Sequence, residues 1–237
     1  MNPVEEAVSL GKLTVALDVD RELSLSLAEQ IAGIVPGVKV GMTLFTQAGP
    51  SLVMQLVEMG FEVFLDLKYH DIPHQVEGAV KKACDLGVSL LTVHTSGGRA
   101  MMEAAARGVE GYKTRVVGVS VLTSMTSDDL AEVCVRGPLE GIVDIRAQLA
   151  QESGLHGVVA SPNELRLLRD SYPSPFLIVT PGVRPKGAEL GDQRRVATPE
   201  EALLRGSDLL VMGRPITGAP SPRDAAVEIM NSIVGRA

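Results

Sequence analysis

Three charged residues, Asp66, Lys68 and Asp71, lie within six positions directly after the apolar run 63–65. Side chains alternate faces along a strand, so the spacing predicts that Asp66 and Lys68 project to the same side. Asp71 falls beyond the strand, on the exit loop. An ammonium group lowers the cost of burying a carboxylate, so a structural ion pair is one interpretation of this D-x-K pattern. A catalytic pair at the mouth of a barrel is the other, and the surrounding elements favour it.

Eight short aliphatic runs alternate with longer amphipathic runs along the chain. The aliphatic runs predict strands at 13–17, 37–40, 62–67, 90–93, 115–121, 157–159, 176–179 and 208–212. The amphipathic runs predict helices that include 23–34, 50–59, 76–86, 99–109, 142–152 and 199–204, and helix-start patterns occur at 161–164 and 198–201. Strands of nearly continuous apolar character are typical of a parallel sheet covered by helices. We therefore predict a single (β/α)8 barrel domain over residues 1–237, with a doubly wound open sheet as the alternative.

Polar residues and glycines gather at the C-terminal ends of the predicted strands, whereas the N-terminal ends show nothing comparable. The loops at the C-terminal end build the active site in barrels of this kind. The asymmetry therefore predicts a catalytic pocket at one mouth of the barrel. The residues concerned are Asp18, Lys39, Asp66, Lys68, His94 to Gly98, Thr123, Ser124, Ser161, Thr180 to Arg184, Gly213 and Arg214.

The connection after the seventh predicted strand is long and has the composition of a phosphate site. Residues 181–195 contain three glycines and several basic side chains, and Gly213 and Arg214 follow the eighth strand. In barrels the loops after strands seven and eight commonly hold a phosphate through backbone N–H groups and arginine. We predict a phosphate ester as substrate; a solvated, basic surface loop is the alternative.

Composition narrows the function class. The chain has 237 residues, 45% of them hydrophobic, and a net charge of −7, which argues against non-specific attraction to nucleic acid or anionic membranes. It lacks both an apolar stretch of about 18 residues and the basic start of a secretory signal. Cys84 and Cys134 fit no metal spacing and are expected to be reduced and buried. We expect a cytoplasmic protein that binds neither nucleic acid nor membrane.

Other motifs point away from helical metal pairs and nucleophilic catalysis. His70 and His74 are four residues apart, but Pro73 between them disfavours a helical metal pair. His94 follows a predicted strand, where a base is one interpretation and a histidine satisfied by the backbone is the preferred one. Neither a dinucleotide fingerprint, nor a P-loop lysine motif, nor a G-x-S-x-G motif occurs.

The octet 66–73 resembles the D-x-K-x-x-D-I-P signature of the orotidine 5′-monophosphate decarboxylase family. D-x-K-x-x-D alone is shared with related sugar-phosphate barrels, so the other segments give the resemblance its specificity. They are similar to the bacterial form, occur in family order and extend the likeness over roughly residues 13–216. These segments are Asp18, 39–41, His94 with 96–98, 121–125, 180–185, 192–196 and 212–214.

The resemblance implies a (β/α)8 TIM barrel of the ribulose-phosphate-binding type. It also implies a homodimer with two shared sites, in which Asp71 and Ile72 reach into the partner's site. The implied catalytic array is Lys39, Asp66, Lys68 and Asp71. The implied nucleotide contacts are Asp18 and Lys39 at the ribose and Thr123 and Ser124 at the pyrimidine. The implied phosphate contacts are Pro181, Arg184, Gln193, Gly213 and Arg214. Ile72 and Gln75 are further implied contacts, and Gln75 stands where the family commonly has Thr.

The activity implied by the resemblance is decarboxylation of orotidine 5′-monophosphate to uridine 5′-monophosphate, the last step of UMP synthesis, without metal or cofactor. The pyrimidine ring offers no carbonyl placed to delocalise a charge at C6, so the protein must stabilise a vinylic carbanion electrostatically. Lys68 fits both as the neighbouring cation and as the proton donor to C6. Asp66 would lie near the departing carboxylate.

Two rival interpretations stay open. The first is a magnesium-dependent sugar-phosphate decarboxylase or aldol-type synthase on the same barrel, with a metal held by Asp18 and Asp66. Lys39 and Lys68 would compete for those carboxylates. The second is a catalytically silent, phosphate-binding barrel, for which a buried cluster of charges would be a cost without a purpose.

Overall fold

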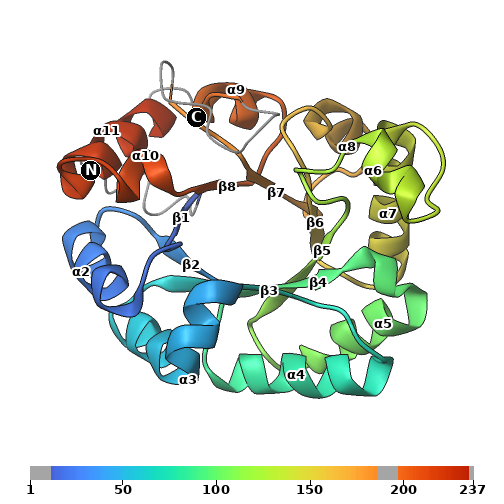
Figure 1. Ribbon diagram of the computed structural model, residues 1–237, viewed down its shortest axis with the longest axis horizontal. Coiled ribbons are helices and arrows are strands. Elements are labelled where there is room, and N and C mark those ends of the chain that lie inside the picture. The colour runs from blue at the N-terminus through green and yellow to red at the C-terminus, as the bar shows by residue number, and fades with distance from the viewer. Residues whose placement is uncertain (1–11, 186–196, 235–237) are drawn as a thin grey trace.

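The computed structural model of the protein describes residues 12–185 and 197–234. Within these ranges eight parallel strands pair in sequence order, and β8 closes the ring against β1. Figure 1 looks along the barrel and shows the helices around the outside of the strands. The predicted (β/α)8 barrel is confirmed. The strands are β1 (Leu13–Ala16), β2 (Gly37–Gly41), β3 (Glu62–Tyr69), β4 (Leu90–His94), β5 (Arg115–Val119), β6 (Gly157–Val159), β7 (Leu177–Pro181) and β8 (Leu209–Met212).

The helices connect the strands and cover the sheet. Thr198 caps α9 as the sequence predicts, because its side chain accepts a hydrogen bond from the Glu201 N–H (3.2 Å). At 161–164 the Ser161 N–H instead donates to the Glu164 carboxylate (2.8 Å), and the helix begins later, at Leu165. The helices are α2 (Arg21–Ile31), α3 (Met42–Glu58), α4 (Pro73–Asp85), the 3-10 helix η1 (Thr95–Gly97), α5 (Arg99–Gly108), α6 (Ser127–Glu132), α7 (Leu139–Glu152), α8 (Leu165–Ser171), α9 (Pro199–Leu204), α10 (Arg214–Thr217) and α11 (Pro222–Val234).

Helix α3 begins earlier than predicted, because it joins two helical segments across a kink. Gly49 adopts a left-handed conformation (φ 65°), and Pro50 starts the second segment, where its missing N–H costs no hydrogen bond. The predicted helix 50–59 corresponds to that second segment. The Gly-Pro pair interrupts the apolar periodicity, so the first segment gave no separate signal.

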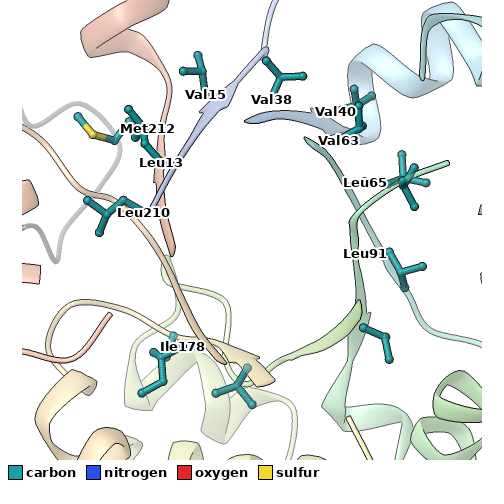
Figure 2. Packing of buried hydrophobic residues seen from close by; sticks show 14 of the residues in the cluster. Leu13, Val15, Val38, Val40, Val63, Leu65, Leu91, Ile178, Leu210 and Met212 are labelled. Atoms are coloured by element: carbon teal, nitrogen blue, oxygen red, sulfur yellow. The ribbon is translucent and has the colours of Figure 1, made fainter. Parts of the chain in front are cut away.

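The main hydrophobic core lies between the strands and the surrounding helices. Side chains at alternate strand positions point outward into it, among them Val15, Val38, Val63 and Leu91, all 0% exposed. Figure 2 shows these side chains directed away from the centre of the barrel. Burying one side chain of this size stabilises the fold by about 1.5–3 kcal/mol.

A second, smaller core fills the inside of the barrel. Phe64 is its one aromatic side chain. Phe64 also lines two cavities, one of about 520 Å³ at the C-terminal mouth and one of about 550 Å³ at the N-terminal mouth. The inner core therefore stands between the two ends of the barrel. Its members are Ala16, Phe64, Leu90, Val117, Val179 and Val211.

The two cysteines differ in environment. Both thiols are free, and Cys84 is buried on α4 as expected. Cys134 is exposed, which corrects the expectation that both are buried. It follows α6 on a turn, where residues 131–134 are all exposed, and it adopts a left-handed conformation (φ 61°). Among the helices described, none is both long and apolar enough to cross a membrane.

Candidate active site

The cavity of about 520 Å³ at the C-terminal mouth collects most of the predicted site residues. Its floor is apolar and includes Ala16, Phe64 and Val211, whereas its walls are polar. Residues from seven of the eight strands or their following loops contribute. The polar and glycine residues that line it are Asp18, Lys39, Asp66, Lys68, Thr123, Gly182, Arg184, Gly213, Arg214 and Thr217.

Alternating charges form the centre of the cavity. The Lys39 ammonium lies 2.9 Å from Asp18 Oδ1 and 3.7 Å from Asp66 Oδ2. The Lys68 ammonium lies 2.8 Å from each of the two Asp66 oxygens. Lys39 is 8% exposed and the Asp66 side chain 15%, so these two charges are largely removed from water, whereas the Asp18 side chain is 67% exposed. Limited contact with water strengthens the attraction between Lys39 and Asp66 and makes each of these two charges depend on the other.

A bulge in β3 presents Asp66 and Lys68 to the cavity. Leu65 pairs with Leu91 and Tyr69 with Val93, so the register shifts between these two pairs. Lys68 sits inside the bulge with φ 52°, a conformation that non-glycine residues seldom adopt and that clusters at functional sites. The sequence predicted the shared face of Asp66 and Lys68 but not this backbone distortion.

Gly41, at the end of β2, gives the lysine and aspartate room to meet. A Cβ atom on this residue would lie 2.9 Å from Lys39 Nζ and 3.2 Å from Asp18 Oδ1. Any larger residue would therefore displace the ion pair. This contact explains the glycine of the segment 39–41.

The second half of the cavity contains the predicted phosphate residues. Pro181 ends β7, Gly182 and Arg184 follow it, and Gly213 and Arg214 follow β8; all five line the cavity. An isolated bridge between Val183 and Ala197 joins the two ends of the long connection after β7. The Arg184 N–H donates to the Ala197 carbonyl (3.0 Å) at the same place. Gln193 lies outside the residues that the structure describes.

Of the residues that the family resemblance assigns to the site, Asp71, Ile72, Gln75 and Ser124 do not line the cavity of a single chain. Among the other polar residues predicted at the strand ends, His94 to Gly98, Ser161 and Thr180 also lie outside its lining. Asp71 is exposed, and its Oδ1 accepts a hydrogen bond from the Ile72 N–H (2.6 Å). Ile72 is 63% exposed. Gln75 lies in the first turn of α4 and Ser124 after β5, and both are exposed. Within one chain the structure thus brings together Lys39, Asp66 and Lys68, but not Asp71.

His94 is fixed beside the charged array in a neutral form. Its Nδ1 lies 2.6 Å from Ser96 Oγ and accepts the Ser96 N–H (3.2 Å), and its ring stacks on His70 at 5.6 Å. Burial, followed by the positive charges of Arg146, His70 and Lys68, lowers the pKa of His94 to about 4. A ring held by neighbouring backbone matches the preferred interpretation of this residue.

The low pKa of His94 predicts a pH-dependent stability. An unfolded chain binds a proton at this residue near its ordinary pKa of 6.5, whereas the folded chain binds it only near pH 4. The unfolded state therefore holds more protons in this window, and the free energy of unfolding falls as the pH falls from about 6.5 to about 4. We expect His94→Asn to have a shallower loss of Tm between pH 7 and pH 4.5 in thermal melts. Parallel curves for both proteins would contradict this assignment.

Sequence reasoning missed two polar residues at the site. Thr92, 0% exposed in β4, donates from Oγ1 to Asp66 Oδ1 (2.9 Å). Thr217, at the end of α10, lines the cavity beside Arg214. Thr92 interrupts an otherwise aliphatic run, and that break in the pattern was the available signal. Thr217 carries no comparable mark in the sequence.

A closed parallel barrel with ionised side chains at the C-terminal ends of its strands defines the class: a (β/α)8-barrel enzyme. Comparison with known proteins gives the family. The model of the "Orotidine 5'-phosphate decarboxylase / HUMPS family" matches residues 11–229. The chain belongs to this family, which confirms the resemblance seen in its motifs.

Individual relatives are similar over nearly the whole chain. The orotidine 5'-phosphate decarboxylase of Halorhodospira halophila is 50% identical over 226 residues, which cover 94% of this chain and 95% of that protein. The protein of the same name from Actinobacillus pleuropneumoniae serotype 5b is 46% identical over 228 residues, with coverage of 94% and 99%. The crystal structure of orotidine 5'-phosphate decarboxylase from Lactobacillus acidophilus has a TM-score of 0.83 at 35% identity, covering 94% of this chain and 98% of that one. These findings identify the chain as an enzyme of the carboxy-lyase class and support decarboxylation of orotidine 5′-monophosphate.

Proposed function

We propose that the protein converts orotidine 5′-monophosphate to uridine 5′-monophosphate and carbon dioxide without a metal or cofactor. The observation that carries this proposal is the array of Lys39, Asp66 and Lys68, joined by contacts of 2.8–3.7 Å inside a cavity of about 520 Å³. Membership of the family supplies the substrate class. The array supplies the means of stabilising a negative charge in that cavity.

Lys68 is the proposed proton donor. Loss of the carboxylate leaves an electron pair on C6 of the ring, in an orbital that the ring system does not delocalise. An ammonium fixed beside that carbon stabilises the pair without having to reorient during the reaction. The same group then transfers a proton to C6 as the general acid. Both Asp66 oxygens hold Lys68 Nζ at 2.8 Å, which supports this positioning.

Asp66 is proposed to lie next to the substrate carboxylate. Two like charges about 4 Å apart repel by about 4 kcal/mol at an effective dielectric constant of 20. Departure of carbon dioxide relieves this repulsion, so it favours the reaction over the bound ground state. The ion pair with Lys39 and the hydrogen bond from Thr92 hold the Asp66 carboxylate in place against the repulsion from the substrate carboxylate.

The remaining lining residues are proposed to bind the nucleotide. Asp18 and Lys39 form an ion pair that offers both a donor and an acceptor to the ribose hydroxyl groups. Thr123 faces the same cavity and is assigned to the pyrimidine. The phosphate is assigned to the two arginine-bearing ends of β7 and β8. The proposed phosphate residues in the cavity lining are Pro181, Arg184, Gly213 and Arg214. The family resemblance adds Gln193, which lies outside the described residues.

Arg214→Ala is expected to affect the nucleotide far more than the nucleoside. Phosphate contacts supply binding energy remote from C6 that serves the transition state. We expect kcat/KM for orotidine 5′-monophosphate to fall by about 100-fold, while the small turnover of orotidine changes little. Arg223→Ala, on the exposed first turn of α11, is the matched control. Equal losses for the two substrates would remove Arg214 from the phosphate site.

A homodimer with shared sites is also proposed. In the part of the chain that the structure describes, Asp71 makes no ion pair, and it lies outside its own chain's cavity. Ile72 next to it is 63% exposed, a cost that a covering partner would remove. Both observations support a partner's cavity as the place where Asp71 and Ile72 act.

Turnover of orotidine 5′-monophosphate tests the proposed function. Loss of its ultraviolet absorbance, with uridine 5′-monophosphate as the product, is the expected result. The assay is run with and without EDTA after dialysis against chelator. Equal rates support metal-independent chemistry, whereas a rate that EDTA abolishes and magnesium restores would favour the rival enediolate enzyme. No turnover under either condition would overturn the proposal.

A further inference from the structure

We propose that Thr92 is a positioning residue, whose hydroxyl holds Lys68 and Asp66 in register for catalysis. The inference rests on the proposed function and extends it to a side chain that does not line the cavity. It is based on the pairing of β3 with β4 and on the two hydrogen bonds that the buried Thr92 hydroxyl makes, one as acceptor and one as donor.

Thr92 is the single residue opposite the bulge. Between the pairs Leu65–Leu91 and Tyr69–Val93, β3 contains three residues, 66–68, and β4 contains only Thr92. Regular ladder hydrogen bonds cannot continue where three residues face one. The polar groups of the bulge therefore need another partner at this point.

The Thr92 hydroxyl is that partner. Its Oγ1 accepts the hydrogen bond of the Lys68 N–H (2.9 Å) and donates to Asp66 Oδ1 (2.9 Å). A hydroxyl has one donor and can also accept, so the two bonds use it in both roles. Thr92 Oγ1 thus links the Lys68 backbone to the Asp66 carboxylate, which in turn binds the Lys68 ammonium.

The hydrogen bond from the Lys68 N–H to Thr92 Oγ1 also helps to fix the unusual backbone conformation of Lys68. A lysine at φ 52° is retained only where its surroundings fix it. Thr92 is 0% exposed, so its hydroxyl cannot be replaced by bulk water without disturbing the core. Removing the hydroxyl should leave the fold closed but allow the Lys68 backbone and the Asp66 carboxylate to move relative to each other.

Thr92→Val tests the role of the hydroxyl, because valine keeps the branched shape and lacks the oxygen. A small misplacement of catalytic groups costs up to about 100-fold in rate. We expect kcat for orotidine 5′-monophosphate to fall by about 10- to 100-fold, with KM and the Kd for uridine 5′-monophosphate changed by about twofold or less. Thr92→Ser, which restores the hydroxyl, is expected to recover most of kcat.

Thr114→Val is the matched control for a purely structural effect. Thr114 is 5% exposed and donates from Oγ1 to the Val88 carbonyl (2.7 Å), just before β5 at the opposite end of the barrel. It should lower Tm as Thr92→Val does, yet leave kcat unchanged. A kcat for Thr92→Val within about twofold of wild type, or a Thr92→Ser enzyme as slow as Thr92→Val, would overturn the inference.

Hydrogen exchange provides a readout that does not depend on the substrate. The Lys68 amide should exchange faster in Thr92→Val, by about tenfold or more, and stay protected in Thr92→Ser and Thr114→Val. Unchanged protection in Thr92→Val would refute the positioning role. A wild-type protein without turnover but with this exchange pattern would instead locate the error in the proposed function. If Thr92→Val does not fold, Thr92→Cys is measured in its place. Because a thiol is only a weak hydrogen-bonding group, the Lys68 amide is expected to exchange faster in Thr92→Cys than in wild type or Thr92→Ser, and unchanged exchange would refute the positioning role.

Discussion

Lys68→Ala is expected to abolish turnover of orotidine 5′-monophosphate while nucleotide binding stays measurable. The substitution removes both the cation beside C6 and the proton that C6 needs, so a loss of about 10⁴-fold or more in kcat is expected. It also leaves Asp66 with Lys39 and Thr92 as its remaining partners. Single-turnover assays measure the rate, and calorimetry with uridine 5′-monophosphate measures binding.

Lys81→Ala is the matched control for Lys68→Ala. Lys81 forms an ion pair with Glu77 at 2.7 Å on the surface of α4, so its loss removes a lysine and an ion pair but no part of the cavity. Wild-type activity is expected. If Lys68→Ala instead retains activity within about tenfold of wild type, a difference of only about 1.4 kcal/mol, another group donates the proton.

Mixing inactive Lys68→Ala and Asp71→Ala proteins is expected to restore activity. In a shared site, Lys68 of one subunit works with Asp71 of the other. A hybrid dimer then has one site with both substitutions and one site with neither. Random exchange of equal amounts makes half of the dimers hybrids, so about a quarter of wild-type activity should return.

The same experiment distinguishes a shared site from a site within one chain. If Asp71 acted on Lys68 of its own chain, both sites of every hybrid would be defective and no activity would return. Native mass spectrometry confirms that subunits have exchanged. Absence of recovery after confirmed exchange would therefore rule out the proposed contribution across the interface.

The sequence was sufficient to predict the barrel and the side of it that carries the site. Alternating apolar runs located all eight strands, because each strand is buried on both faces and reads as a short aliphatic run. Polar residues at strand ends located the cavity. Lys39 in β2 and Asp66 and Lys68 in β3 meet there, as their positions near the C-terminal ends of the predicted strands implied.

Other features depend on contacts that no local pattern encodes. The β3 bulge arises from the register against β4, some 26 residues later, as the Thr92–Asp66 hydrogen bond shows. Strand periodicity assumes a regular ladder and so missed both the left-handed Lys68 and the role of Thr92. Asp71 was assigned to the array from the motif, and the geometry of one chain leaves it outside the cavity.

The position of the Phe64 ring limits the routes by which substrate and products can enter and leave the barrel. It lines the cavities at both mouths, so the inner core acts as a partition rather than a conduit. For a decarboxylase on this barrel, carbon dioxide and the product nucleotide must leave through the same C-terminal mouth by which the substrate enters. A smaller side chain at this position would thin the apolar layer that separates the two cavities.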